Sequence, residues 1–592
     1  MADISKIQIE SGTYNIKDAY LREKAVQYYN TLSSFKSSTV VEEGQVIKTL
    51  GYFNLNDGGS GLYLVREKTV NDVVDDITII GLTDNTLVGE LIDDVVNVKQ
   101  FGAKGDGVTD DIDAINKALA QGKSIVFPEG SYAVSEKIDI DSDNIIIYGN
   151  NSTIIPTHQY NCFDVNGDNV TINELNIDGT SNYGYNINGS YCKIKNLTIS
   201  NTLHSAIMLI GSHNIVDGVT AIECGWDCVS NYGDASYNTI QNSNAIRTKR
   251  HGFSTDPTTS NISFINCYCE NVGNPSLDEG HSCFHFEHSN NGLVNNCHAV
   301  YDNAHAGNTA QSTSSRYVGV RIYYSDNVIV DNFRLDFKNT YAPLNASSVL
   351  NCENSNNAKI INSSFINNSS SVNVGYIYTA SYIMFMNCKM YNVYISEQDG
   401  YAGQVKMIKD CDIEITTKPN FANFKYLLEN AIIEGNKFKG HANLDYFISA
   451  NFMNCIIKDN IFDTGKEGIR FSRNTSNASD TSKFTRVEDC TFKDCTAMIN
   501  YIYGTAGTNY VNRCLFTGTC DYVVKANYNW FYMTNCFKNN LTVNTEYAHT
   551  AYFTLFNDLQ TQFDYVCKAL NPSNARYKIS VNAGGQVIAT AE

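Results

Sequence analysis

The amino-acid sequence predicts an all-β chain wound as a single-stranded parallel β-helix, and three observations support this fold class. Asn, Ser, Thr, Ile, Val and Tyr are abundant, whereas only 7 of the 592 residues are proline, and this composition favours strands and turns over helices. A short apolar motif recurs at a nearly constant spacing over most of the chain. Between the motifs, apolar residues alternate with turns that contain Asn or Gly.

The recurrent motif has the form apolar-x-(Asn/Asp/Gly/Glu)-x-x-apolar. It begins at Ile172, Ile194, Val216, Ile240, Phe264, Val294, Val330, Ile360, Phe385, Ile408, Ile433, Ile457, Val487, Val511 and Met533. Most starts are 22 to 25 residues apart, which fits one coil of a parallel β-helix. Leucine-rich repeats have a similar period, but they need recurrent leucines and helix-forming segments that this chain lacks. Because counterparts on successive coils lie about 4.8 Å apart, the repeated Asn and Cys of the motif are expected to form an internal ladder.

Three segments upstream of the repeats identify the start of the β-helix. They are VNVKQFGAKGDGVTDDIDAINKAL (96–119), SIVFPEGSYAVS (124–135) and IIIYGNNSTI (145–154). They resemble the opening of pectate-lyase-like right-handed β-helix proteins. The resemblance implies a right-handed helix whose Gly-Asp-Gly-x-Thr-Asp-Asp turn leads into a capping helix from Asp110 to Leu119. It identifies a fold with a tendency to act on carbohydrate, but not a reaction.

The first 95 residues differ from the repeats. The segments ISKIQIESGTYNIKDAYLREKAV and VIKTLGYFNLNDGGSGLYLV resemble the amino-terminal regions of tail proteins from phages of Gram-positive, low-GC bacteria. In such spikes this region binds phage tail or baseplate proteins, the β-helix meets the host surface glycan, and the assembly is a homotrimer. The resemblance therefore predicts a small virion-attachment region at 1–95, a β-helix at 96–545, and a short C-terminal cap or trimerisation segment at 546–592, where the coil pattern ends.

Composition limits the other classes of protein. The start, MADISKIQIE, lacks the apolar core of a signal peptide, which predicts synthesis in the cytoplasm. The resemblance to phage tail proteins implies that the protein is made in the host and becomes part of the virion. The 18 cysteines are then expected to be buried free thiols. No apolar run is long enough to predict a membrane span. A net charge of -19 argues against a nucleic-acid partner.

The histidines concentrate where the repeat spacing is widest. Eight of the 11 lie between residues 204 and 305, beside the insertions NVGNPSLDEG (271–280) and DNAHAGNTAQSTSSR (302–316). Insertions on a rigid scaffold often carry function. We therefore expect the functional site around the run HSCFHFEH at 281–288.

Five strands can be aligned around this run: HSAIMLI (204–210), WDCVSNY (226–232), RHGFSTD (250–256), HSCFHFE (281–287) and YVGVRIY (317–323). Their fourth column is apolar throughout, so strand alternation predicts that the first, third, fifth and seventh columns face outward. The third column contains only small residues, which predicts the floor of a groove. In the seventh column Asp256 and Glu287 occupy adjacent coils, and Glu353 follows Tyr323.

Asp256 and Glu287 are the predicted catalytic carboxylates. Two close carboxylates repel each other, so one retains its proton near neutral pH and can act as an acid. Glycoside hydrolysis requires such a pair. His285 and His281 complete the predicted catalytic set as proton carriers or sugar contacts, whereas His251 and His288 are expected to be structural. The predicted substrate-binding residues are charged or aromatic neighbours, namely Arg250, Arg321, Lys249, Trp226, Tyr232, Tyr323, Asp278 and Glu279.

Three segments invite comparison with polygalacturonases, which carry Asn-Thr-Asp, Asp-Asp, Gly-His-Gly and Arg-Ile-Lys in that order. This chain has Ser-Thr-Asp at 254–256, Asp-Glu-Gly-His at 278–281 and Arg-Ile-Tyr at 321–323. The order is similar, but the spacing and several residues differ. A polygalacturonase mechanism therefore does not transfer to this chain.

Together these features predict a phage tail spike that binds a capsular polysaccharide or wall teichoic acid and depolymerises it by hydrolysis, with no cofactor required. A lyase would use Arg321 or a histidine as the base, often with calcium. A teichoic-acid phosphodiesterase would bind a divalent metal through the four predicted catalytic residues. A non-catalytic receptor-binding spike or adhesin would not need the carboxylate pair. A site between subunits would add carboxylates such as Glu397 or Asp399.

Overall fold

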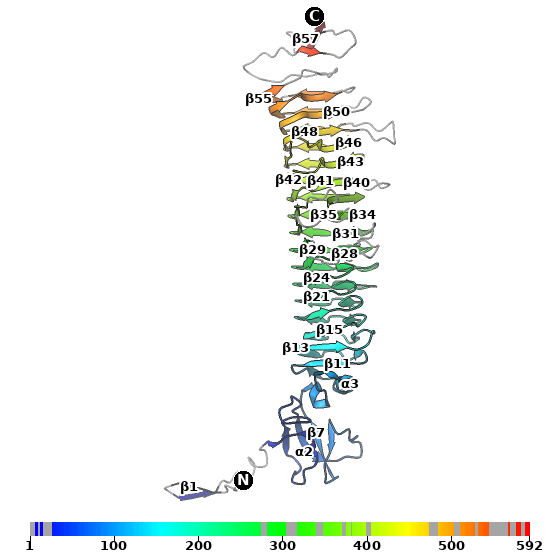
Figure 1. Cartoon of the computed structure of the whole chain (residues 1–592), viewed down its shortest axis with the longest axis vertical. Coiled ribbons are helices and arrows are strands. Elements are labelled where there is room, and N and C mark those ends of the chain that lie inside the picture. The colour runs from blue at the N-terminus through cyan, green and yellow to red at the C-terminus, as the bar shows by residue number, and fades with distance from the viewer. Residues whose placement is uncertain are drawn as a thin grey trace. The chain divides into compact units, whose positions relative to one another are not determined.

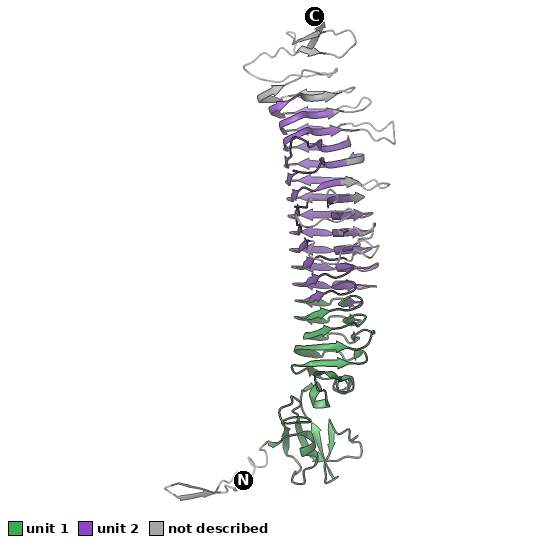
Figure 2. Cartoon of the chain, in the orientation of Figure 1, with its two compact units in different colours: residues 1–207, 214–219 green, residues 208–213, 220–592 purple. Residues whose placement is uncertain are grey.

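A computed structural model describes residues 6–9, 12–15, 26–273, 281–302, 317–338, 347–369, 374–380, 382–397, 404–472, 484–501, 509–526, 531–534, 536–543, 566–568, 576–581 and 587–591. The chain divides into two compact units, which Figure 2 shows in different colours. Unit 1 comprises residues 1–207 and 214–219, and unit 2 comprises residues 208–213 and 220–592.

Unit 1 contains a small mixed sheet that precedes the coils. Its strand order is β3-β4-β5-β7-β6. The elements are β3 (Gln27–Tyr29), α2 (Leu32–Lys36), β4 (Val46–Thr49), β5 (Leu62–Glu67), β6 (Ile79–Gly81) and β7 (Leu87–Leu91), preceded by the hairpin β1 (Lys6–Ile9) and β2 (Gly12–Asn15). Phe35, Tyr63 and Val88 form its buried core. This sheet lies in the region that the sequence assigns to virion attachment, a role that stays a prediction.

The Gly-Asp-Gly-x-Thr-Asp-Asp segment forms the turn before the capping helix. Gly105 and Gly107 have positive φ angles of 62° and 77°, which glycine adopts at little cost. The Asp106 carboxylate accepts hydrogen bonds from two backbone amides of the turn. Asp110 still belongs to strand β9 (Asp106–Asp110), and Asp111 occupies the N-cap position of helix α3 (Ile112–Leu119). The helix therefore begins two residues later than predicted.

The remaining elements of unit 1 are the first coils. Strand β8 (Val95–Asn97) pairs in parallel with β10 and is the first strand of the coils. The elements are η1 (Val98–Phe101), β10 (Ser124–Val126), β11 (Ser131–Val134), β12 (Ile138–Ile140), β13 (Ile146–Pro156), β14 (Phe163–Val165), β15 (Thr171–Asp178), β16 (Tyr185–Ile187), β17 (Lys193–Lys195), β18 (Thr198–Ser200) and β20 (Ile215–Asp217). Strand β19 (Ile207–Leu209) spans residues of both units.

Unit 2 repeats a coil of three strands, and equivalent strands of successive coils stack in parallel (Figure 1). The first strands form sheet 1, which contains β22 (Val229–Asn231), β25 (His251–Thr255), β28 (His281–Glu287), β31 (Tyr317–Tyr323), β34 (Ser347–Glu353), β37 (Val374–Ala380), β40 (Tyr394–Glu397), β43 (Asn420–Glu429), β46 (Tyr446–Met453) and β53 (Tyr522–Ala526). The second strands form sheet 2, which contains β23 (Thr239–Gln241), β26 (Ser263–Ile265), β29 (Leu293–Asn295), β32 (Ile329–Asp331), β35 (Ala358–Ile361), β38 (Tyr382–Met386), β41 (Gln404–Lys409), β44 (Ile432–Glu434), β47 (Ile456–Lys458), β49 (Arg486–Glu488), β51 (Asn509–Asn512) and β54 (Phe531–Thr534).

The third strands of the coils form sheet 3. It contains β21 (Thr220–Ile222), β24 (Asn244–Ile246), β27 (Tyr268–Glu270), β30 (His298–Tyr301), β33 (Arg334–Phe337), β36 (Ser364–Asn367), β39 (Lys389–Tyr391), β42 (Asp412–Glu414), β45 (Lys437–Lys439), β48 (Ile461–Phe471), β50 (Thr491–Tyr501), β52 (Leu515–Cys520) and β55 (Phe537–Val543). The long strands β48 and β50 each pair with more than one neighbour, so they also extend sheet 1. The predicted parallel β-helix is therefore confirmed.

The apolar fourth column of the sequence alignment fills the interior of unit 2. Val229, Phe253, Phe284 and Val320 are fully buried and lie in register on successive coils. The rings of Phe253 and Phe284 stack with centroids 5.5 Å apart. Burying one such side chain contributes about 1.5–3 kcal/mol, so repeated stacking stabilises the coil without a helix on either face.

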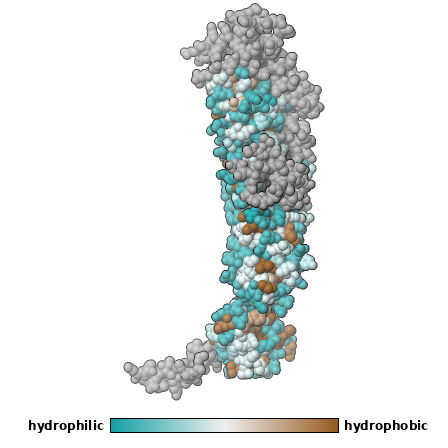
Figure 3. Space-filling model, in the orientation of Figure 1, coloured by the Kyte–Doolittle hydropathy of each residue, from teal (hydrophilic) through white to brown (hydrophobic). Residues whose placement is uncertain are grey.

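The Asn-Cys pairs form two ladders rather than the single internal ladder that we predicted. The asparagines take left-handed φ angles at an exposed corner, and their side chains bond from coil to coil, as from Asn296 Nδ2 to Asn266 Oδ1 at 2.6 Å. The cysteine that follows points inward, and Cys297 Sγ contacts the carbonyl oxygen of Phe264 at 3.4 Å. The 17 cysteines from Cys162 to Cys536 are buried free thiols, as predicted. The face drawn in Figure 3 is mainly hydrophilic, in keeping with polar residues on the outside of the coils.

Most of the predicted C-terminal segment 546–592 lies outside the described residues. Within it, β56 (Val566–Lys568), β57 (Arg576–Val581) and β58 (Val587–Ala591) form an antiparallel three-stranded sheet. Its predicted role as a cap or trimerisation segment stays a prediction. In the part of the chain that the structure describes, no helix has the length and apolar character needed to cross a membrane.

Candidate active site

Strand β28 carries the histidine run, and its side chains do not follow simple alternation. The Ser282 hydroxyl lies 3.0 Å from His251 Nδ1 and 3.2 Å from His285 Nδ1, so Ser282 and His285 share a face. Cys283 points the other way, and its Sγ contacts Tyr301 Oη at 3.2 Å inside the coil. Because Cys283 and Phe284 both face inward, the alternation breaks between them.

This break corrects the prediction for the third column. Its members in unit 2, Cys228, Gly252, Cys283 and Gly319, are buried and do not form the floor of an open groove. A Cβ atom at Gly252 would lie 2.5 Å from Cys269 Sγ and 2.6 Å from the carbonyl oxygen of Cys283. The small residues are therefore needed because the backbone of sheet 1 lies close to the packed interior.

Gly252→Ala is expected to lower the thermal unfolding midpoint, because the added methyl group overpacks the interior by about 1–3 kcal/mol. Differential scanning calorimetry of the two proteins measures the effect. An alanine that faced an open groove would instead stabilise the protein slightly, since it restricts the unfolded chain. A raised midpoint would therefore support the groove floor predicted from alternation and contradict the buried position.

Asp227 binds Arg250 and its neighbours at one end of the site, and the sequence did not predict this role. It is fully buried and accepts two hydrogen bonds from Arg250, Nε to Oδ1 at 3.0 Å and Nη2 to Oδ2 at 2.6 Å. The hydroxyls of Ser230 and Ser254 and the amide of His251 also donate to it. Burial alone would raise the pKa of Asp227, but Arg250 and the two serines outweigh it and hold the pKa below its usual value. Asp227 is therefore an anion that fixes Arg250 in place.

Glu287 lies at the end of β28 and is joined to the histidines. His285 Nε2 lies 3.2 Å from Glu287 Oε2, and the Glu287 side chain is 34% exposed. This hydrogen bond lowers the pKa of Glu287, and burial only partly opposes it. Burial lowers the pKa of His285, although the Glu287 carboxylate acts in the opposite direction. A neutral His285 with its proton on Nε2 satisfies both observations, since Nδ1 then accepts from Ser282.

The pKa of Asp256 is raised, whereas that of Glu287 is lowered. The register pairs Thr255 with Phe286, so the next residues, Asp256 and Glu287, occupy adjacent coils as the sequence analysis placed them. Burial raises the pKa of Asp256 to about 6, Arg250 opposes the rise, and the nearby carboxylates of Asp227 and Glu287 add to it. One carboxyl of the pair thus holds its proton up to a pH of about 6, while the pKa of the other is lowered.

The other predicted histidines differ in position. His281 is fully buried, and it lies close enough to His251 to contribute to the lowering of that residue's pKa. The His251 ring lies 4.2 Å from that of His285, and burial lowers its pKa well below the ordinary value, so His251 belongs to the cluster. His288 follows the strand in a left-handed conformation and stacks on Tyr324 with centroids 4.8 Å apart.

The predicted binding residues border this cluster on sheet 1 and its corner. The Arg250 guanidinium lies 4.5 Å from the ring centroid of Trp226, and that of Arg321 lies 4.9 Å from the ring of Tyr323. Tyr232 is 54% exposed. Lys249 is also exposed.

The seventh column continues one coil further, because Tyr323 pairs with Glu353 as predicted. Asp278, Glu279 and Asp399 lie outside the described residues, as does the side chain of Glu397. Among the described residues, no group of three or more His, Cys, Asp or Glu side chains is arranged to hold a metal ion. The four predicted catalytic residues therefore do not form the ligand set of the metal-dependent alternative.

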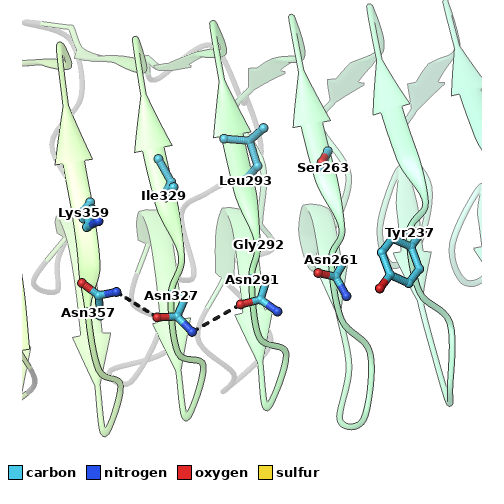
Figure 4. Close-up of a pocket in the computed structure, with 10 residues that line it drawn as sticks. All are labelled: Tyr237, Asn261, Ser263, Asn291, Gly292, Leu293, Asn327, Ile329, Asn357 and Lys359. Carbon is cyan, nitrogen blue, oxygen red and sulfur yellow. Dashed lines mark hydrogen bonds between the residues drawn. The ribbon is translucent and has the colours of Figure 1, made fainter.

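A groove of about 540 Å³ lies on sheet 2, on a different face of the coil from the histidine cluster (Figure 4). Its lining residues are Tyr237, Asn261, Ser263, Asn291, Gly292, Leu293, Asn327, Ile329, Asn357 and Lys359. Asn357 Nδ2 donates to Asn327 Oδ1 at 2.8 Å, and Asn327 Nδ2 donates to Asn291 Oδ1 at 3.3 Å. The groove contains none of the predicted site residues.

Two family models match the chain. Residues 95–161 match the family described as rhamnogalacturonase A/epimerase, pectate lyase-like, and residues 161–332 match the family described as right handed beta helix region. These matches cover the predicted opening of the β-helix and the candidate site.

Relatives with similar sequences include phage proteins. The chain is 28% identical over 219 residues to the pre-neck appendage protein of Bacillus phage B103, which covers 34% of this chain and 24% of that protein. It is 50% identical over 48 residues to the tail spike protein of an Escherichia phage, which covers 8% of this chain and 6% of that protein. The chain thus spans about a quarter of the length of the first of these relatives.

Among solved structures, the tailspike of Acinetobacter phage vb_AbaP_AS12 superposes with a TM-score of 0.46 at 15% sequence identity, over 72% of this chain and 74% of that chain. The fold itself is shown by the family matches and by the parallel pairing of the coils. This chain folds as a pectate-lyase-like right-handed parallel β-helix, and it resembles the appendage and tail spike proteins of phages.

Proposed function

We propose that this protein is a phage tail spike that binds a host cell-surface glycan, a capsular polysaccharide or wall teichoic acid, and depolymerises it by hydrolysis. The similarity to phage appendage and tail spike proteins supports a place in the virion tail. In this proposal residues 1–95 bind other tail proteins and three copies of the chain assemble. The β-helix carries the glycan site.

The observation that carries the hydrolase proposal is the divergence of the two carboxyl pKa values. Asp256 retains its proton up to a pH of about 6, whereas the pKa of Glu287 is lowered. Glycosidases need one protonated and one ionised carboxyl on either side of the bond that breaks. The environments of Asp256 and Glu287 supply this difference.

The roles of the two carboxyl groups in catalysis follow from the difference between their pKa values. Asp256 donates its proton to the glycosidic oxygen as the bond to the anomeric carbon breaks. Glu287 either attacks that carbon directly or takes a proton from the attacking water. His285 donates a hydrogen bond to Glu287 and keeps it ionised. Trp226 and Tyr323, the rings contacted by Arg250 and Arg321, provide surfaces for sugar rings.

Mass spectrometry of the products tests this proposal. Purified capsular polysaccharide and wall teichoic acid from candidate hosts would each be incubated with the protein. Hydrolysis adds one water per bond cleaved, so we expect defined oligosaccharides whose masses include that water. Intact polymer that still binds the protein would contradict the enzyme proposal and identify a receptor-binding spike.

The rate of cleavage is expected to fall as the pH rises through about 6. Above the pKa of Asp256, which is about 6, the acid loses its proton, so kcat/KM should decrease about tenfold per pH unit. At low pH the rate should fall only below the usual carboxyl range, because the pKa of Glu287 is lowered. Initial rates between about pH 2 and 8 measure both limits. A rate that increases through pH 6 would assign Asp256 as a base and contradict its role as the acid.

A lyase is the second candidate, and the neutral His285 favours it. Burial lowers the pKa of His285, so the ring is uncharged and becomes a base once Nδ1 is released from Ser282. A lyase would remove a proton next to a uronic carboxylate, and Arg321 could bind that carboxylate. Its products would lack the added water and contain a carbon-carbon double bond, which the same mass measurement detects.

A further inference from the structure

Arg321 and Asn351 carry two buried polar atoms that no hydrogen bond satisfies. The two residues are in register on the adjacent strands β31 and β34. Arg321 Nε and Asn351 Oδ1 are both buried without a hydrogen-bond partner among the residues that the structure describes. Asn351 is only 7% exposed. Buried polar atoms are almost always paired, so an unpaired donor and an unpaired acceptor on neighbouring coils indicate a binding position.

The orientation of the Asn351 amide is fixed by Glu353. Asn351 Nδ2 donates to Glu353 Oε1 at 2.7 Å. Rotating the amide would place Oδ1 against this carboxylate and create a repulsion between two acceptors. Oδ1 is therefore the acceptor that faces away from Glu353, and a ligand group must donate a hydrogen bond to it.

Both atoms are covered in the structure, so a ligand reaches them only when the two side chains move apart. A sugar hydroxyl would then satisfy both atoms at once. Its oxygen accepts the hydrogen bond from Arg321 Nε, and its proton is donated to Asn351 Oδ1. A carboxylate could accept from Arg321 but has no proton for Asn351. An O-acetylated or deoxy position likewise lacks the required donor.

We propose that Arg321 and Asn351, with Glu353 behind them, form a subsite that selects a sugar unit by a free hydroxyl group. This inference rests on the proposed glycan cleavage, whose site is close by. Arg321 is in register with His285, and Tyr323 is in register with Glu287. The subsite therefore lies one to two coils, roughly 5–10 Å, from Glu287 and would hold a sugar next to the bond that breaks.

Asn351→Ala tests the subsite. Asn500→Ala is the matched control, because Asn500 is 5% exposed and its Nδ2 donates to Glu467 Oε1 at 2.7 Å, in the same way as Asn351 to Glu353. We expect Asn351→Ala to raise KM for the polymer about tenfold with kcat changed less, and Asn500→Ala to leave both unchanged. Equal losses of thermal stability without a change in KM would overturn the subsite, because the two polar atoms would then have only a structural role.

The hydroxyl requirement has its own test. Polymer that the wild-type protein cleaves would be partially O-acetylated and digested, and the sugars at the newly formed chain ends would be analysed by mass spectrometry. We expect one hydroxyl position beside the cut to be free of acetyl groups in wild-type products and acetylated at the background level in Asn351→Ala products. Acetyl groups at that position in wild-type products would contradict the subsite. Failure of the wild-type protein to cleave any polymer would instead contradict the proposed function itself.

Discussion

Glu287→Gln is expected to lower the rate of glycan cleavage on the order of a thousandfold. The amide can still accept a hydrogen bond from His285, whose Nε2 lies 3.2 Å from Glu287 Oε2 in the native protein. It cannot stabilise positive charge at the anomeric carbon or accept a proton from water. The substitution also removes the negative charge of Glu287, which raises the pKa of Asp256. The rate of product formation at saturating polymer measures the change.

Glu434→Gln provides the control for Glu287→Gln. Glu434 pairs with Lys409 on sheet 2 at 3.3 Å, where both side chains are partly exposed. Its replacement removes the same charge and should leave cleavage and binding unchanged. Glu287→Gln should still bind the polymer, because the aromatic and arginine contacts remain. A Glu287→Gln protein that cleaves at the wild-type rate would exclude Glu287 from the reaction.

Asp227→Ala is expected to destabilise the protein by about 3–5 kcal/mol, because it leaves the Arg250 guanidinium without its buried partner. It also removes the acceptor for the Ser230 and Ser254 hydroxyls and for the amide of His251. Cleavage should fall too, since Arg250 would no longer be held beside Trp226. Urea denaturation measures the loss of stability.

The neighbouring ion pair of Glu223 and Arg247 gives a matched control. Glu223 Oε1 lies 3.0 Å from Arg247 Nε, but the two side chains are 49% and 33% exposed. Glu223→Ala should therefore cost less than about 1 kcal/mol. If Asp227→Ala lowers the free energy of unfolding no more than Glu223→Ala does, the contacts of Asp227 with Arg250, Ser230 and Ser254 do not stabilise this part of the coil.

The sequence alone was sufficient to predict the β-helix. The spacing of the apolar motif is set by the length of one coil. In unit 2 each motif begins on a strand of sheet 2, so the repeat and the coil have the same period. The Gly-Asp-Gly turn was equally predictable because its glycines take positive φ angles. The Asn-Cys pairs were harder to interpret. The left-handed asparagine turns the chain at a corner, so only the cysteine that follows points inward.

The candidate site was predictable only in part. The register that brings Asp256 beside Glu287 follows from counting three residues forward from Phe253 and Phe284 in the apolar column. Alternation failed at Cys283, where a local break turns two consecutive side chains inward and places Ser282 against His285. Asp227 was missed because its importance arises from partners 23 and 27 residues away, Arg250 and Ser254.

A double-mutant cycle of Asp256→Asn and Glu287→Gln tests the central claim most directly. Two groups that act as one catalytic unit are strongly non-additive, because either loss alone disables the reaction. We expect each single variant to lose about two to four powers of ten in kcat and the double variant to lose little more than the worse single variant. A wild-type rate in either single variant, or losses that multiply in the double variant, would contradict an acid and base that work as a pair.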